Sequence, residues 1–136
     1  MTDQGMADLK RMEGCKLQPY RDTKGRWTVG YGHNLEATPI SRAAALHIFL
    51  DDLANAEQEL ARRLPFWDTL PPNIRDILVN LAFNMGVEKL MKFKKTLYFL
   101  ANKQWENAAD ELMDSDAARD LPGRYKELSD KIREEV

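Results

Sequence analysis

Apolar residues recur at helical spacing along most of this chain. Near its start they form a face that leads from Met6 to Glu13 at intervals of three and four residues, which places Glu13 on the inward side of a helix. Thr2 or Asp3 can cap this helix, and Gly14 is a natural stop. The pattern therefore predicts a first helix that ends at Glu13.

The pattern changes in the segment LQPYRDTKGRWTVGYGH, residues 17–33, which is rich in Tyr, Trp, Thr and Val. The central DTKG is typical of a type I turn with Asp first and Gly last, so the segment predicts a β-hairpin, the only sheet we expect. Residues that face each other across a hairpin share a side of the sheet. Tyr20, Asp22 and Thr28 should therefore lie on one side and Trp27 on the other.

The rest of the chain predicts helices. Ser41 can cap a long helix that keeps its apolar stripe to Pro65, and a core helix follows the Pro71-Pro72 break and stops at Gly86. Shorter helical patterns follow, and Pro122 begins the last one. We therefore expect a mainly helical α+β fold in one domain, 1–136, with a sheet-containing lobe at about 14–50 and a helical lobe at about 51–136 that includes the first helix.

Composition narrows the function classes. With 136 residues, 43% hydrophobic and 31% charged, the chain fits a compact globular domain, and its net charge of −2 argues against a nucleic-acid partner. No apolar run reaches the roughly 18 residues of a membrane span, and the start lacks a signal-peptide pattern, so we expect synthesis in the cytosol and no stable membrane insertion. One cysteine and two histidines provide no disulfide and no metal cluster, and we expect no cofactor.

Two acids near the predicted hairpin suggest a chemistry. Burial and the negative end of the helix dipole should raise the pKa of Glu13, whereas Asp22 in a polar turn should stay ionised. Cleavage of a glycosidic bond needs such a differently poised pair, and Thr28 is placed to hold a water. A solvated helical Glu and a turn Asp are the common alternative, and spacing alone does not decide between the two readings.

The string E-G-x-x-L-x-x-Y-x-D-T-x-G-x-x-T-x-G-x-G-H, residues 13–33, resembles the phage-type lysozymes or endolysins of glycoside hydrolase family 24. The resemblance continues through IFLDD, VNLAFNMG, KQWENAA and LPGRYKEL. It implies a two-lobed lysozyme fold whose lobes are joined by a long helix. It also implies inverting hydrolysis of the β-1,4 bond between N-acetylmuramic acid and N-acetylglucosamine in peptidoglycan, with Glu13, Asp22 and Thr28 as the catalytic residues.

The resemblance implies further roles. Substrate contacts fall on Tyr20, Gly30, Asn34, Phe83 and Asn84. A packing role for Phe83 in the core is about as plausible. His33 is expected to be structural and to pair with Asp52, and Arg124 is expected within reach of Glu13. A surface pair of Arg124 with Glu127 or Asp120 is the alternative.

Three functions remain in view. The first is a monomeric lytic enzyme that acts on peptidoglycan strands in the periplasmic cell wall after a separate holin has opened the membrane of the bacterial host. The second is a catalytically weak wall-binding module, and the third is a hydrolase of chitin-like glycans. Intact Glu13, Asp22 and Thr28 favour the first.

Overall fold

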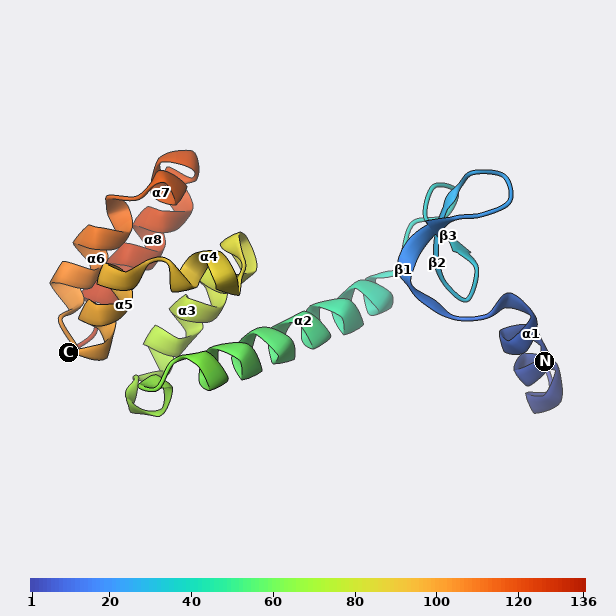
Figure 1. Cartoon of the computed structure of the whole chain (residues 1–136), viewed down its shortest axis with the longest axis horizontal. Helices are drawn as coiled ribbons and strands as arrows, with labels where there is room; N and C mark the ends of the chain where they lie inside the picture. The colour runs from blue at the N-terminus through green and yellow to red at the C-terminus, as the bar shows by residue number, and fades with distance from the viewer. The chain divides into compact units, whose positions relative to one another are not determined.

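The computed structural model describes all residues, 1–136, and divides them into two compact units, Met1–Ile48 and Phe49–Val136. Figure 1 labels their helices and strands.

The first unit begins with helix α1 (Asp3–Glu13). The Thr2 hydroxyl accepts a hydrogen bond from the Gly5 amide at 3.1 Å, and the helix ends at Gly14, whose φ of 71° lies in the region that favours glycine. The predicted start and stop are thus confirmed. Within this unit no residue of α1 is buried.

A three-stranded antiparallel sheet completes the first unit, in the order β1 (Lys16–Arg21), β2 (Trp27–Gly30) and β3 (His33–Asn34). Tyr20 lies opposite Thr28, so these two residues share a side of the sheet, as predicted. The Gly25 amide donates to the Asp22 carbonyl at 2.9 Å, which closes the predicted turn. The sequence did not predict β3, because two residues are too few to show alternation.

Helix α2 (Arg42–Arg63) begins in the first unit and ends in the second. The Ser41 hydroxyl accepts from the Ala44 amide at 3.1 Å and so caps the helix as predicted. At its far end Leu60 is fully buried and Leu64 is 4% exposed, so the second half of the predicted stripe enters the core of the helical unit.

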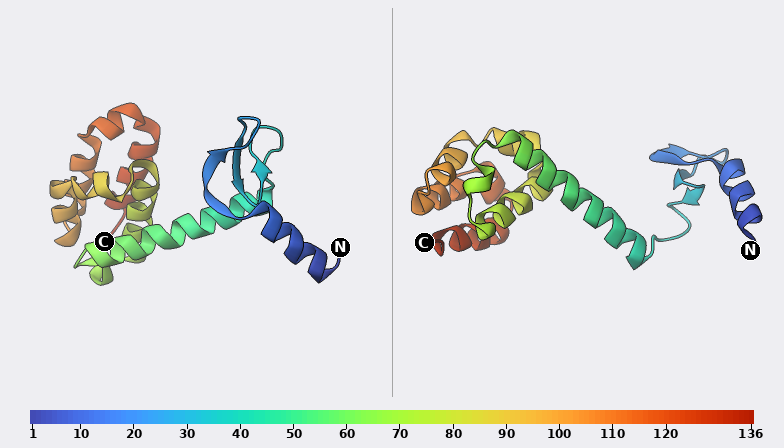
Figure 2. Two further views of the ribbon diagram at one scale, coloured as in Figure 1. Left: turned by 45° about the vertical axis from the view of Figure 1, so that its right-hand side comes forward. Right: turned by 90° about the horizontal axis from the view of Figure 1, so that it is seen from below.

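The helical unit continues with seven further helices, which Figure 2 shows in two more views. They are η1 (Trp67–Thr69), α3 (Pro72–Met85), α4 (Val87–Met91), α5 (Lys94–Ala101), α6 (Trp105–Met113), α7 (Asp116–Asp120) and α8 (Pro122–Arg133). The fully buried core includes Ile74, Leu78, Leu81, Leu90, Leu100, Leu112, Tyr125 and Ile132. The mainly helical α+β fold class is confirmed. The short helices η1, α4 and α7 were not predicted, because three to five residues carry too little periodicity.

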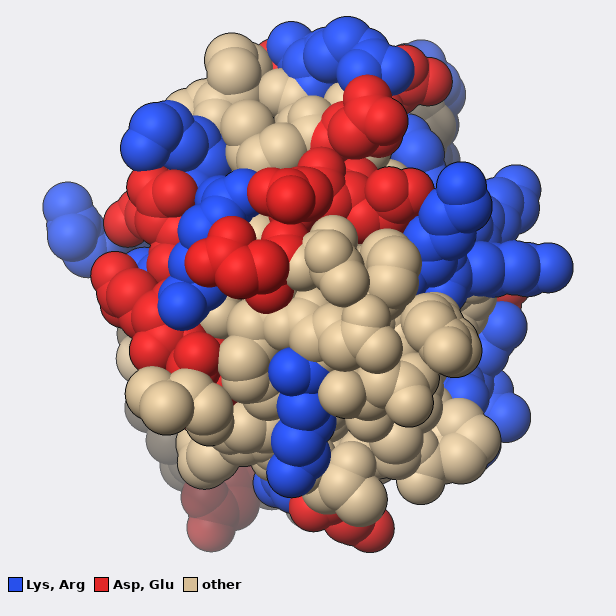
Figure 3. All heavy atoms as spheres, turned by 90° about the vertical axis from the view of Figure 1, so that its left-hand side faces the viewer, with Lys and Arg blue, Asp and Glu red and all other residues tan.

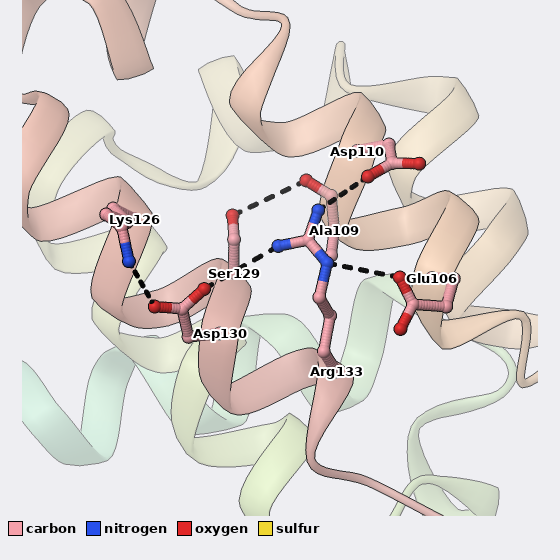
Figure 4. Close-up of polar contacts among 7 residues, drawn as sticks. All are labelled: Glu106, Ala109, Asp110, Lys126, Ser129, Asp130 and Arg133. Carbon is pink, nitrogen blue, oxygen red and sulfur yellow. Dashed lines mark hydrogen bonds and ion pairs between the residues drawn. The ribbon is translucent and has the colours of Figure 1, made fainter.

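Helices α6 and α8 pack together, and Arg133 links them on the surface (Figure 4). Its Nε lies 3.1 Å from Glu106 Oε2, and its Nη2 lies 2.5 Å from Asp110 Oδ1. A third carboxylate, Asp130 on α8 itself, lies 3.7 Å from Nη1. The buried Ser129 hydroxyl donates to the Ala109 carbonyl at 3.4 Å across the same interface. Ion pairs on the surface and a buried hydrogen bond thus both stabilise the interface between α6 and α8.

Charges of both signs share the surface face drawn in Figure 3, where acidic side chains run between basic ones beside an uncharged area. This mixture agrees with the small net charge of −2. A polyanion such as nucleic acid needs a continuous basic face, which this view does not offer.

No helix of the structure is both long enough and apolar enough to cross a membrane.

The unit Met1–Ile48 holds α1 and the sheet, and the predicted lobes at about 14–50 and 51–136 stay a prediction. The predicted membership of the first helix in the helical lobe stays a prediction.

Candidate active site

Glu13 is the last residue of α1, and its side chain lies against the backbone of Gly32. A Cβ atom at Gly32 would stand 2.5 Å from Glu13 Oε2 and 3.2 Å from Glu13 Cδ. Gly32 also has a φ of 71°, so both its conformation and the space beside it require glycine. Within this unit Glu13 is exposed, so the first unit does not provide the burial that the sequence analysis expected.

Asp22 is held by the turn that follows it. Its Oδ1 accepts from the Lys24 amide at 2.8 Å and from the Arg26 amide at 2.9 Å. The hydrogen bond from Arg26, supported by the bond from Lys24 and the charges of both residues, lowers the pKa of Asp22 against a smaller desolvation effect. Asp22 therefore stays ionised, as predicted, and its second oxygen, Oδ2, makes no hydrogen bond within the protein.

Thr28 lies opposite Tyr20 in the sheet and is only 3% exposed. Its hydroxyl donates to the Arg26 carbonyl at 2.9 Å. Because the hydroxyl proton is used in this bond, Thr28 can only accept a further hydrogen bond from a bound molecule. Asp22 and Thr28 are thus fixed by the amide and the carbonyl of the same residue, Arg26.

Three other predicted site residues, Tyr20, Gly30 and Asn34, also lie in the first unit. Lys16 Nζ lies 4.3 Å from the centre of the Tyr20 ring, and Gly30 has a φ of 67°. Asn34 Oδ1 accepts from the Glu36 and Ala37 amides at 2.9 and 3.0 Å, so this oxygen holds the turn after β3. No bond engages its side-chain nitrogen, which keeps two donors free for a ligand.

The remaining predicted contacts lie in the helical unit. Phe83 is 41% exposed, its ring centre is 5.7 Å from that of Phe49, and both line a cavity of about 360 Å³ together with Asn80 and Arg124. Phe83 is therefore not a buried core residue of this unit. Asn84, on the next position of α3, accepts a hydrogen bond from the Tyr125 hydroxyl.

Arg124 binds Asn80 rather than an acidic neighbour on its own helix. Its Nε and Nη2 lie 3.0 and 2.7 Å from Asn80 Oδ1, and Nη2 also donates to the Asn80 carbonyl at 3.1 Å. The structure shows no ion pair of Arg124 with Glu127 or Asp120.

Two predicted pairs join residues of different units. These pairs, His33 with Asp52 and Arg124 with Glu13, stay predictions. Within its own unit, His33 Nε2 lies 3.1 Å from the Thr38 carbonyl oxygen.

Sequence reasoning missed three residues that shape the site: Gly32, Arg26 and Tyr125. Gly32 had a signal, because a second glycine two residues after Gly30 suggests unusual backbone. Arg26 acts through its backbone N–H and C=O, which every residue type except proline carries, and Tyr125 needs a partner 41 positions away.

Known proteins resemble this chain over most of its length. The family model described as phage lysozyme matches residues 10–128. The protein named "Probable T4-type lysozyme 1" of Dictyostelium discoideum is 28% identical over 85% of this chain and 85% of its own length. The protein named "Endolysin" of Acyrthosiphon pisum secondary endosymbiont phage 1 is 32% identical over 64% of this chain and 60% of its own length. The protein named "SAR-endolysin" of Escherichia phage P1 is 27% identical over 88% of this chain and 71% of its own length. The chain therefore belongs to the phage lysozyme family, whose common activity is glycan hydrolysis of the lysozyme type.

Proposed function

We propose that this protein cleaves the β-1,4 bond between N-acetylmuramic acid and N-acetylglucosamine of peptidoglycan, with inversion at the anomeric carbon. Glu13 donates a proton to the leaving glycosidic oxygen. A water attacks the anomeric carbon from the opposite face and gives its proton to Asp22 Oδ2. Proton exchange with solvent then restores the protonated Glu13 and the ionised Asp22.

The joint attachment of Asp22 and Thr28 to Arg26 supports this assignment most directly. Asp22 has a lowered pKa and one free oxygen, as a general base for water requires. Thr28 can only accept, so a water beside it can donate one hydrogen to Thr28 and the other to Asp22. The water's lone pair is then left for the sugar.

Relatives named endolysin support a role in the bacterial cell wall. We propose that the protein is made in the host cytoplasm and reaches the wall after a separate holin has permeabilised the membrane. Expression in bacterial cells should then cause lysis only when such a membrane protein or a permeabilising agent is added. Lysis by the protein alone contradicts this part of the proposal.

Purified peptidoglycan and a soluble chitooligosaccharide together test the substrate. Wild type should release reducing ends from peptidoglycan much faster than from the chitooligosaccharide. Glu13→Gln should lose at least about a hundredfold in kcat on peptidoglycan while its thermal unfolding stays that of wild type. Faster release from the chitooligosaccharide supports a chitin-like substrate instead. Near-normal turnover by Glu13→Gln contradicts the catalytic assignment, and no release by folded wild type supports the wall-binding module.

A further inference from the structure

Tyr125 is the largest fully buried side chain of the structure, yet its phenol is a polar group that needs a partner. That partner is Asn84 Oδ1, at 2.5 Å. Burial raises the pKa of the Tyr125 phenol more than the charge of Arg124 lowers it. The phenol therefore stays protonated, and it remains a hydrogen-bond donor at neutral pH.

This contact determines which way the Asn84 amide faces. Because Oδ1 accepts from Tyr125, the Nδ2 group with its two N–H donors points elsewhere. Nδ2 makes no hydrogen bond within the protein, and no buried side-chain nitrogen or oxygen lacks a partner. Asn84 is a partly exposed residue. Its Nδ2 is therefore accessible to solvent and free to bind.

Arg124, the residue before Tyr125 on α8, makes a similar contact with Asn80, which lies one turn before Asn84 on α3. Arg124 donates to Asn80 Oδ1, so consecutive residues of α8 fix two asparagine amides that lie on one face of α3. Both amides are held through their oxygens. The partly exposed Phe83 lies between these two positions in the sequence.

We infer that Tyr125 is a positioning residue, which holds the Asn84 amide so that its N–H groups donate to an oxygen acceptor of the bound glycan, such as a hydroxyl or an acetamido carbonyl. This inference rests on the proposed function, because it requires Asn84 to contact that glycan. The phenol itself does not touch the substrate. It disfavours the alternative amide orientation, in which the buried phenol hydrogen would lose its acceptor and the amide oxygen would face the glycan's acceptor and repel it.

Steady-state kinetics on defined soluble peptidoglycan fragments test the inference. Tyr125→Phe keeps the ring and removes the donor, so KM should rise about five- to tenfold while kcat stays within about twofold. Tyr98→Phe is the matched control. It removes the hydroxyl of a tyrosine that is 60% exposed on α5, and it should change neither KM nor kcat. An unchanged KM in Tyr125→Phe, with only a lower Tm, overturns the inference.

Asn84→Asp is the sharper variant, because it keeps the oxygen that accepts from Tyr125 and loses the amino group. It should keep the Tm of wild type and raise KM at least as much as Tyr125→Phe. Wild-type KM in Asn84→Asp shows that the contact is only structural. Tyr125→Phe combined with Asn84→Ala should have the KM of Asn84→Ala alone, whereas multiplied effects mean independent roles and overturn the inference.

A binding measurement decides the case in which Tyr125→Phe folds poorly. In the Glu13→Gln background, the Asn84 side-chain amide resonances should shift when N-acetylglucosamine oligomers are added, and Asn84→Asp should weaken binding of these oligomers. No shift and unchanged binding overturn the inference. The proposed function fails separately, through an active Glu13→Gln variant.

Discussion

The carboxylate of Glu13 occupies the space in which a side chain at Gly32 would begin, because a Cβ atom at Gly32 would lie 2.5 Å from Glu13 Oε2. Glu13 ends α1, and Gly32 follows β2. The contact therefore places the proposed proton donor beside the sheet whose hairpin turn holds the proposed base, Asp22.

Gly32→Ala should displace the Glu13 carboxylate and lower kcat by at least about tenfold, because small shifts of a catalytic group are costly. Gly25→Ala is the matched control, since Gly25 has a similar φ of 77° and no atom near its absent Cβ. Both variants should lose about 1–2 kcal/mol of stability from backbone strain. Kinetics and thermal unfolding of both variants separate strain from displacement. Equal losses of kcat contradict the proposed role of the contact.

The lowered pKa of Asp22 predicts a pH dependence. A carboxyl whose pKa is lower in the folded than in the unfolded state stabilises the fold above its unfolded value, and this contribution is lost as pH falls through the folded value. The acid limb of kcat that belongs to Asp22 should therefore lie below the ordinary aspartate range.

The difference in Tm between wild type and Asp22→Asn should accordingly shrink as pH is lowered from 7 to 2.5. Asp120→Asn, at an exposed carboxyl outside the proposed site, is the control for the general effect of removing one negative charge. A Tm difference for Asp22→Asn that stays constant over this range argues against the two turn hydrogen bonds as its cause.

Thr28→Val should lower stability by about 1–3 kcal/mol, because it removes a buried donor and leaves the Arg26 carbonyl without it. It should also lower kcat, since the acceptor for the proposed water is lost. Thr28→Ser keeps the hydroxyl and should recover most of the activity. If valine and serine variants have equal kcat, the hydroxyl has no role in the reaction.

Arg133→Met should lower Tm by about 2–6 °C, because it removes a cation that contacts carboxylates on both α6 and α8 but keeps much of the apolar stem. Activity per folded molecule should not change. The Tm deficit should decrease in high salt, which screens exposed charge pairs. A salt-independent deficit points to lost packing rather than lost charge. Lys126→Met, at an exposed pair with Asp130 within α8, should cost less.

Local chemistry made much of the fold predictable. Thr2 and Ser41 cap the starts of α1 and α2, and Gly14 ends α1, as the sequence predicted. Helix caps and helix ends depend mainly on residues that are close in the sequence. The shared side of Tyr20 and Thr28 followed from the alternation of side chains in a hairpin. The catalytic candidates were recognised by their motif rather than by their spacing.

The remaining features depend on contacts that sequence patterns do not encode. The backbone of Arg26 joins Asp22 to Thr28, and backbone groups leave no mark in the residue type. The bond from Tyr125 to Asn84 depends on how α8 packs against α3, so it became visible only in three dimensions.

The anomer that wild type releases first from purified glycan strands of peptidoglycan tests the central claim most directly. Proton NMR of the new reducing end, recorded before mutarotation, should show the α anomer, because water attacks a β-linked sugar from the opposite face. Glu13→Gln, measured in parallel, should release no detectable product in that time. An initial β anomer contradicts the inverting mechanism and the role of Asp22 as the base that activates water.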